Sequence, residues 1–299
     1  MTELTIMAAG LLPDNEPVRV FDQRQVTLPT GLVLNSEDQV GVLWHLETIE
    51  GWDTPASTGR VTQRAYQSGG WADRAFYASR IITLEGVIVA ATPALLRDAK
   101  DRFAAAIPLD VLEELAVVEA GQSRSVWVRQ DGDPILKDIS SRASRFSLQL
   151  VAPDPRRLRS GPVSSLRTGL PSSSGGLSVA FTIPFSIAAT TVAGVLSVFN
   201  AGTAPAPGVV RIDGPVQRPV VRHEEQGHEL VFDLILDAGQ WLEVDLDLHT
   251  VLLNGQASRR GLMRGRWFTL TPGVNTISWS SLTAAPTAAL TVSWRDAWK

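Results

Sequence analysis

The sequence predicts a mainly β protein with two domains. The chain of 299 residues exceeds the usual size of one domain. Its C-terminal half consists of short segments rich in β-branched residues, separated by turn signals at regular spacing. A clear helical signature occurs once, in the N-terminal half. Hydrophobic residues make up 44% and charged residues 19%, which is typical of a folded chain.

The N-terminal half is expected to contain short strands and a single helix. Residues 80–90 are β-branched and partly alternating, as in a strand. Thr92 is a plausible N-cap, Pro93 suits the first helical position, and Pro108 stops the helix. Apolar residues recur between them at helical spacing: Leu95 or Leu96, Ala99, Phe103 and Ala106. The helix should therefore lay an apolar stripe on a sheet.

A domain boundary is predicted after a strand at residues 145–151. Residues 153–157 are proline-rich, and Gly and Ser dominate residues 171–176, as in a flexible connection. We expect a first domain at residues 1–160, a linker at 161–176 and a second domain at 177–299.

The second domain is expected to be a β-sandwich or barrel. Asn254-Gly255 and Pro272-Gly273 are strong turn signals. One stretch alternates apolar and acidic residues, with Leu242, Val244, Leu246 and Leu248 expected inward and Glu243, Asp245 and Asp247 outward. Further strands are expected at residues 177–184, 195–200, 208–213, 220–223, 230–236, 251–253, 267–270, 275–280 and 289–294.

Composition excludes several classes of function. The net charge of -4 argues against nucleic-acid binding, which needs a basic surface. Cysteine is absent, which excludes disulfides, thiolate metal sites and cysteine nucleophiles. The start of the chain does not resemble a signal peptide, and no apolar run is long enough for a membrane span. We therefore expect no membrane association, no metal and no cofactor.

The sequence contains no catalytic motif with the spacing that its chemistry requires. His223 and His228 flank two glutamates, but a zinc-protease helix needs histidines four residues apart, so a polar hairpin loop is the better interpretation. Glu243, Asp245 and Asp247 are explained as the solvated face of a strand rather than as hydrolytic carboxylates. The chain is thus expected to bind or build rather than to catalyse.

Tryptophan is the least ordinary residue type, with nine copies. Trp44, Trp52 and Trp71 lie in stretches rich in Gly, Gln and Ser, and each is either a core residue or an anchor at a subunit interface. A lectin would stack exposed tryptophans on sugar rings, for which the candidates are Trp241, Trp267 and Trp279. Sugar binding is the less favoured of these alternatives.

Several segments together resemble the distal tail proteins of phages with long, non-contractile tails. In the first half these are residues 79–86, the Leu95-Leu96 helix and the closing strand with its turn at residues 145–155. In the second half they are residues 200–207, 210–214, 239–245, 254–255 and 270–275. Their order and spacing carry the resemblance, which spans about residue 78 to residue 299 and is weaker before it.

The resemblance implies a tail-tube-like β-sandwich or split barrel with one α-helix, followed by a galectin-like β-sandwich. It also implies a homo-hexameric ring that joins the tail tube protein to a tail-associated hub or tip protein and can hold receptor-binding proteins. DNA would pass through this ring without specific binding, and an acidic or neutral lumen is expected. The protein would be made in the host cytoplasm and end at the distal end of the tail in the virion.

Two further expectations follow. The polar stretch from Gly51 to Gly70 is interpreted as an arm that becomes ordered only in the assembly. The alternative to a structural hub is a carbohydrate- or receptor-binding minor tail protein that acts through its C-terminal sandwich; a glycan-cleaving enzyme would need a second carboxylate, of which the sequence gives no sign.

Overall fold

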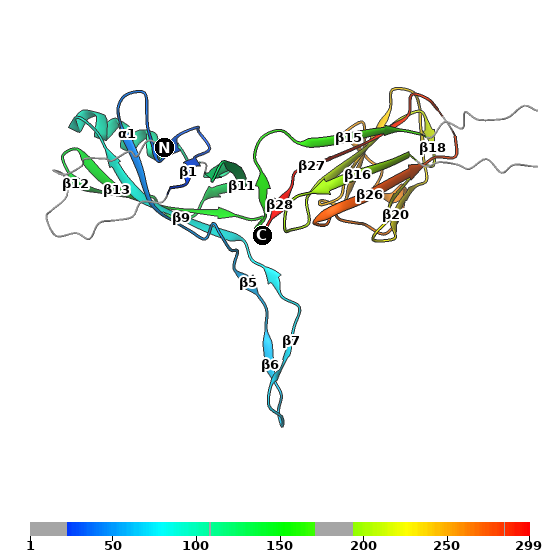
Figure 1. Ribbon diagram of the computed structural model, residues 1–299, viewed down its shortest axis with the longest axis horizontal. Coiled ribbons are helices and arrows are strands. Elements are labelled where there is room, and N and C mark those ends of the chain that lie inside the picture. Colours follow the sequence, from blue (N-terminus) through cyan, green and yellow to red (C-terminus); the bar gives the residue numbers. More distant parts are fainter. Residues whose placement is uncertain (1–22, 108, 171–193, 284) are drawn as a thin grey trace, which may run out of the picture. The chain divides into compact units, whose positions relative to one another are not determined.

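A computed structural model describes residues 23–107, 109–170, 194–283 and 285–299 (Figure 1). The fold is mainly β, as expected, with a single α-helix in the described residues. The chain forms two compact units, Met1–Pro155 and Arg156–Lys299. Each unit has its own hydrophobic core.

Among the described residues, the first unit contains the α-helix and 13 of the 28 strands. Its elements are β1 (Gln25–Thr27), β2 (Val33–Leu34), β3 (Ser36–Glu37), β4 (Leu43–Glu50), β5 (Ser57–Thr58), β6 (Val61–Gln63), β7 (Gly70–Ala72), β8 (Phe76–Tyr77), β9 (Arg80–Val89), α1 (Pro93–Ala105), β10 (Glu113–Glu119), β11 (Gln122–Gln130), β12 (Ile135–Ser140) and β13 (Ala143–Ala152). The main sheet has the order β2-β1-β10-β11-β13-β9-β4-β3, and β12 pairs with β13. All the strand pairs within this unit are antiparallel.

The two ends of this sheet meet at Asn35, which lies between β2 and β3. The Asn35 side chain donates to the carbonyl of Arg24 over 2.7 Å and accepts from the amide of Leu46 over 2.8 Å. Its own amide donates to the carbonyl of Trp44 over 2.6 Å. Asn35 has a φ of 60°, which Asn tolerates better than most residues. Asn35 therefore links the two ends of a sheet that surrounds a single core, in agreement with the expected β-sandwich or split barrel.

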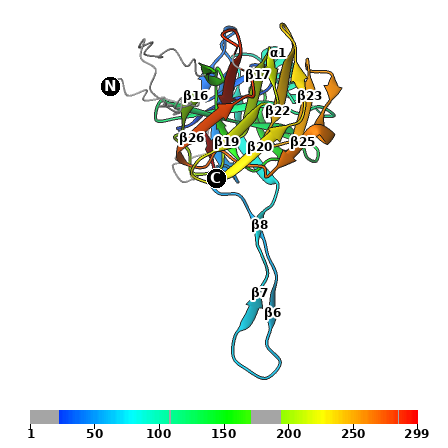
Figure 2. The ribbon, with the colours of Figure 1, turned by 90° about the vertical axis from the view of Figure 1, so that its right-hand side faces the viewer.

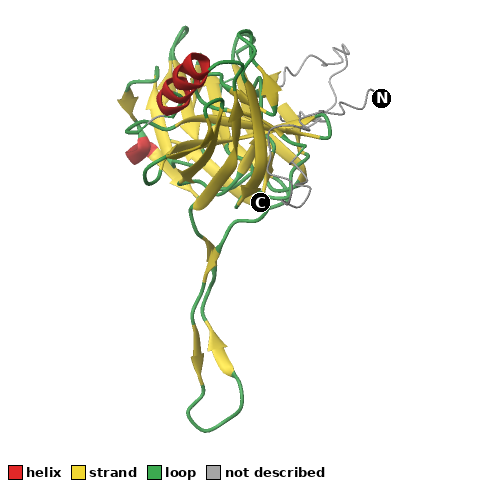
Figure 3. Ribbon diagram, turned by 90° about the vertical axis from the view of Figure 1, so that its left-hand side faces the viewer, coloured by secondary structure: helices red, strands yellow, loops and turns green. Residues whose placement is uncertain are grey.

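Helix α1 begins and ends close to where the sequence predicts (Figure 3). The Thr92 hydroxyl accepts a hydrogen bond from the Leu95 amide over 3.2 Å, and Pro93 is the first helical residue. The helix buries Leu96, Ala99 and Phe103, and the Phe103 ring lies 4.8 Å from the ring of Phe146 on β13. The apolar stripe thus packs on the sheet as expected.

Between β4 and β9 the chain forms a long two-stranded hairpin, residues 53–79, which we call the arm (Figures 1 and 2). Strand β5 pairs with β8, and β6 pairs with β7. No arm residue is buried, and only Pro55, Gly70 and Ala78 are even half-buried. The expected arm was therefore too short at its C-terminal side, because the returning strand continues to β9.

The second unit is a sandwich of two antiparallel sheets. Its elements are β14 (Arg157–Arg159), β15 (Ser164–Gly169), β16 (Gly194–Asn200), β17 (Gly208–Asp213), β18 (Val216–Gln217), β19 (Val220–His223), β20 (His228–Phe232), β21 (Ile235–Leu236), β22 (Trp241–Asp245), β23 (Thr250–Leu253), β24 (Ala257–Ser258), the 3-10 helix η1 (Arg260–Leu262), β25 (Met263–Gly265), β26 (Gly273–Ser280), β27 (Ala289–Trp294) and β28 (Ala297–Trp298). One sheet has the order β15-β27-β17-β22-β23-β24 and the other β16-β26-β19-β20-β25 (Figure 2). Strand β14 pairs with β28, which ties the start of the unit to its last strand.

The expected alternation in this unit holds as far as Leu246. Leu242, Val244 and Leu246 are buried, whereas Leu248 is 72% exposed and was wrongly placed inside. The reason is local, because β22 ends at Asp245, whose carboxylate accepts from the amides of Asp247 and Leu248 over 2.8 Å each. That turn ends the alternation.

The expected strand at residues 267–270 is absent, although two of its apolar side chains, Phe268 and Leu270, are buried. Side chains replace the strand ladder here. The Gln226 side chain donates to the carbonyl of Thr269 over 2.6 Å, and a ring nitrogen of His228 lies 3.0 Å from the carbonyl of Trp267.

The boundary between the units differs from the expected linker at residues 161–176. Residues 164–169 form β15, which pairs with β27 inside the second unit. Residues 171–176, and the strand expected at 177–184, lie outside the described residues.

Candidate interaction surfaces

The arm is the surface most strongly marked for contact with another chain. Tyr66 is 98% exposed and Trp71 is 66% exposed, and Phe76 and Tyr77 are also exposed. The guanidinium of Arg64 lies 4.5 Å from the centre of the Trp71 ring, and that of Arg74 lies 5.2 Å from the centre of the Phe76 ring. Exposed aromatic and arginine side chains are the types enriched at the centres of protein interfaces.

The root of the arm, in contrast, is fixed by buried groups. Arg80 is buried, and its guanidinium donates to the carbonyls of Gly51 (2.8 Å), Trp52 (2.6 Å) and Pro155 (2.8 and 3.0 Å). Gly51 has a φ of 73°, and a Cβ there would lie 1.8 Å from the carbonyl oxygen of Ile81. The arm therefore leaves the first unit from a defined point.

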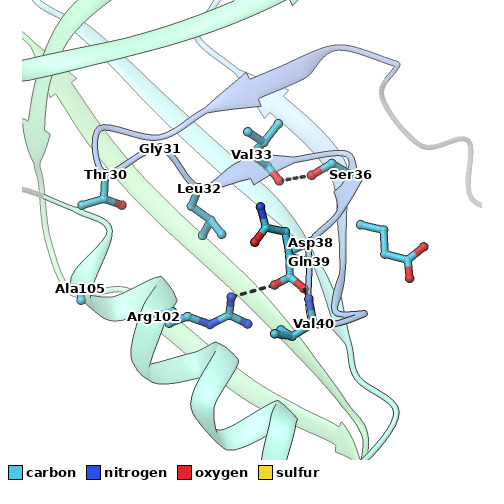
Figure 4. Close-up of a pocket in the computed structure, with 11 residues that line it drawn as sticks. Thr30, Gly31, Leu32, Val33, Ser36, Asp38, Gln39, Val40, Arg102 and Ala105 are labelled. Atoms are coloured by element: carbon cyan, nitrogen blue, oxygen red, sulfur yellow. Dashed lines mark hydrogen bonds and ion pairs between the residues drawn. The ribbon is translucent and has the colours of Figure 1, made fainter.

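A groove of about 670 Å³ lies between the chain segment 30–40 and the last turn of α1 (Figure 4). Its apolar lining comes from Leu32, Val33, Val40 and Ala105. Its charged lining comes from Glu37, Asp38 and Arg102. We call this hollow the α1 groove.

Asp38 holds one wall of the α1 groove in place. Its carboxylate accepts from Arg102 over 2.7 Å, from the Trp44 indole over 3.2 Å and from the amides of Val40 and Val42. Burial alone would raise the pKa of Asp38, but the hydrogen bonds from Val42, Arg102, Trp44 and Val40 together lower it. Asp38 is therefore ionised at neutral pH and fixes the β3–β4 turn against α1.

Two of the three tryptophans suggested as interface anchors are core residues. Trp44 and Trp52 are fully buried in the core of the first unit, so neither can reach a neighbouring chain. Tryptophan has the largest apolar surface, and at these positions the core takes it up. Trp71 is exposed near the end of the arm and remains a candidate contact residue.

The three tryptophans suggested for sugar binding do not form one exposed platform. Trp279 is only 1% exposed. Trp267 has His249 stacked 4.5 Å from its ring centre and the guanidinium of Arg260 at 5.0 Å. Trp241 is half-buried and has the guanidinium of Arg211 4.3 Å from its ring centre. A sugar ring needs a free aromatic face, which these contacts compete for.

The His223–His228 segment is the tip of the β19–β20 hairpin, as predicted. His223 is buried, and its Nε2 lies 2.9 Å from the Asn275 Oδ1 atom. Glu225 turns back to accept from the Thr276 amide at 2.9 and 3.0 Å. These residues lock the hairpin onto β26, so their chemistry is accounted for by the fold.

The acidic strand residues also have structural partners. Asp247 forms an ion pair with Arg156 at 2.7 Å, and Asp245 caps the turn after β22. Among the described residues, no three His, Asp or Glu side chains are grouped so as to hold a metal ion. No helix in the described part of the chain is both long and apolar enough to cross a membrane.

Sequence reasoning did not find the α1 groove. The groove combines the turn at residues 30–40 with α1, which are about sixty residues apart in the chain, and no local pattern marks such a meeting. The one available signal was the charged face of α1, which contains Arg102.

Residues 201–298 match the family of the siphovirus-type tail component, C-terminal domain. A comparison with curated protein sequences finds no match.

Two solved structures are similar to the chain. The Dit protein of phage SPP1, described as a hub of the adsorption apparatus of phages that infect Gram-positive bacteria, has a TM-score of 0.66 and 11% identity, covering 93% of this chain and 100% of its own. A chain of the phage P2 baseplate, in its activated conformation with Ca, has a TM-score of 0.49 and 11% identity, covering 90% and 97%. The resemblance to the distal tail proteins is thus confirmed, by sequence over residues 201–298 and by fold over 93% of the chain.

Proposed function

We propose that this protein is a structural hub of a long, non-contractile phage tail. It forms a hexameric ring that connects the tail tube to the tail tip or baseplate and anchors host-recognition proteins. The observation that carries the proposal is that residues 201–298 match a tail-component family in sequence, while 93% of the chain matches the fold of the SPP1 Dit protein.

The first unit is the ring-forming part of this proposal. A ring of identical subunits is a head-to-tail assembly, in which each copy offers one surface and receives another. The arm provides such a surface, because it carries exposed aromatic residues and leaves the unit from a rigid root. Trp71 is the arm residue proposed to contribute most to the contact.

The remaining partners follow from the position of a hub. The ring contacts the tail tube protein on one side and a hub or tip protein on the other, and the second unit can carry receptor-binding proteins. DNA passes through without specific binding, and we propose an acidic or neutral lumen because a basic lumen would retain DNA. A lumen lined mainly by arginine in the assembled ring would refute this point.

The proposed role is structural and not enzymatic, and the proposed site is the distal end of the tail in the virion. The carbohydrate-binding alternative gains no support from the second unit, because Trp279 is buried and other side chains stack on Trp241 and Trp267.

Immunogold labelling of intact virions tests the proposal. Antibodies raised against the purified protein should label the tail at the end away from the capsid. Labelling along the whole tail, or at the capsid end, would contradict the hub role. Labelling of the tail tip together with binding of the purified protein to host glycan would favour the alternative.

A further inference from the structure

We propose that the α1 groove receives the arm of a neighbouring copy of this chain. The inference rests on the proposed ring and names the receiving surface, which the ring alone leaves open. The groove is hollow and lined by aliphatic side chains, including Val40, which is 53% exposed. Such a surface is stabilised when another apolar group covers it.

The chemistry of the arm complements that of the groove. The arm carries three arginines, Arg60, Arg64 and Arg74, against two aspartates, and its aromatic side chains are exposed. In the groove, Arg102 is neutralised by Asp38 at 2.7 Å, which leaves the carboxylate of Glu37 without a hydrogen bond or ion pair in the described chain. An arginine beside a large aromatic ring, as in the Arg64–Trp71 pair, matches an unpaired carboxylate beside an aliphatic surface.

The positions of the two surfaces also suit a head-to-tail contact. The groove adjoins the start of β4 at Leu43, and the arm begins just after the end of β4 at Glu50. A strand of this length separates them by about 25 Å. The arm therefore leaves its own unit at the far end of β4 from the groove, and each leg of about twelve residues can reach about 40 Å. Donor and acceptor surfaces at different places on one subunit are what a closed ring requires.

The arm needs such an acceptor because it is not stabilised by contacts of its own side chains with a core. An isolated two-stranded hairpin that buries no side chain is marginally stable in water. Packing Trp71 and Tyr66 against the aliphatic wall of a groove would remove apolar area from water and hold the two legs together.

The natural absence of cysteine permits a direct cross-linking test with no background. One variant carries Ser68→Cys at the end of the arm. A second variant carries Gln39→Cys in the groove and is made longer by a tag, so that the mixed disulfide can be recognised by its size. A matched control carries Ser258→Cys, at an exposed position on β24 of the second unit. Under mild oxidation, the arm and groove variants together should form the mixed disulfide about tenfold more than the arm variant with the control.

Charge exchange provides a second measurement. Glu37→Arg and Arg64→Glu should each reduce the fraction of protein in oligomers, and the double variant should recover part of the loss because the pair is restored with its signs reversed. Arg97→Glu, on the exposed face of α1, is the matched control and should have no such effect.

The outcomes separate this inference from the proposed ring. Six-fold rings without the arm–groove disulfide, and without rescue in the double variant, would overturn the groove as acceptor and leave the ring standing. If no oligomer and no mixed disulfide form at any concentration, with or without the tail tube protein, both proposals fail.

Discussion

Arg80 shows how one buried cation positions an exposed element. Its guanidinium binds three carbonyl groups, those of Gly51, Trp52 and Pro155, which belong to the arm root and to the end of the first unit. A buried guanidinium is costly unless its donors are satisfied, and the fork of an arginine satisfies several carbonyls at once. Arm direction therefore depends on this residue more than on any arm residue.

Replacement of Arg80 by lysine should destabilise the first unit by about 2–4 kcal/mol, because one ammonium cannot reach all three carbonyls and some are left buried without a donor. Chemical denaturation measures the loss. Arg97→Lys, at an exposed position, should change stability by less than about 0.5 kcal/mol. Equal effects of the two substitutions would show that the Arg80 contacts do not hold the root.

Asp38 gives the first unit a specific pH dependence. Its pKa is lowered in the folded state, so the stabilisation from its hydrogen bonds is present above the unfolded value of about 3.8 and is lost as the pH falls through the lower folded pKa. Asp38→Asn should cost about 1–3 kcal/mol at pH 7, and the difference from the natural protein should shrink near pH 3. Urea unfolding at both pH values checks this, with Asp98→Asn on the exposed helix face as control. A difference that stays constant with pH would contradict it.

Residue types alone could not sort the tryptophans. Trp44 and Trp71 both lie in stretches that contain Gly, Gln and Ser, yet one lies against Phe103 in the core and the other lies on an exposed arm. What separates them is the strand pairing, which puts Trp44 on the inward face of β4. The alternation of Val42, Trp44 and Leu46, all buried, is the local pattern that marks this inward face.

At the scale of elements, the sheet forms the hydrophobic core of the first unit, whereas the arm lies outside that core. The arm buries no side chain, so it adds nothing to the core, whereas β9 and β13 pair along their whole lengths and carry much of that core. Loss of the arm should therefore affect assembly and leave folding intact.

Replacement of residues 59–75 by Asn-Gly tests this separation. The two-residue turn would close the remaining β5–β8 pair as a short hairpin. The free energy of unfolding should change by less than about 0.5 kcal/mol, while light scattering should show a monomer. Rings from the shortened chain would exclude the arm as the contact, and a large loss of stability would show that the arm is part of the fold.

Local signals predicted the elements that local interactions build. The Thr92 cap and Pro93 located α1 correctly, since both act within one turn. Asn254-Gly255 likewise marked the turn from β23 to β24, where both residues have positive φ. The strand expected at 267–270 is absent. Side chains of Gln226 and His228 contact the carbonyls of Thr269 and Trp267, and Leu270 makes only an isolated bridge to Ala206, which no local pattern reveals.

At the scale of the molecule, each unit closes its own core, and the chain passes from one unit to the other between Pro155 and Arg156. The Gly-, Pro- and Ser-rich composition after residue 160 placed the boundary later. Strand β15 lies within that region and pairs with β27, so turn-rich composition there marks connections inside the second unit. The two-domain plan was nonetheless predictable, because length and strand spacing are properties of the whole chain.

The mass of the purified protein in solution tests the ring most directly. Light scattering over a concentration series, with negative-stain images of the same sample, should give particles of six times the 32.3 kDa chain and closed six-fold rings. The tail tube protein, added to a parallel sample, should only promote the same closure. A strict monomer in both samples, or an open filament in place of a ring, would contradict the hub.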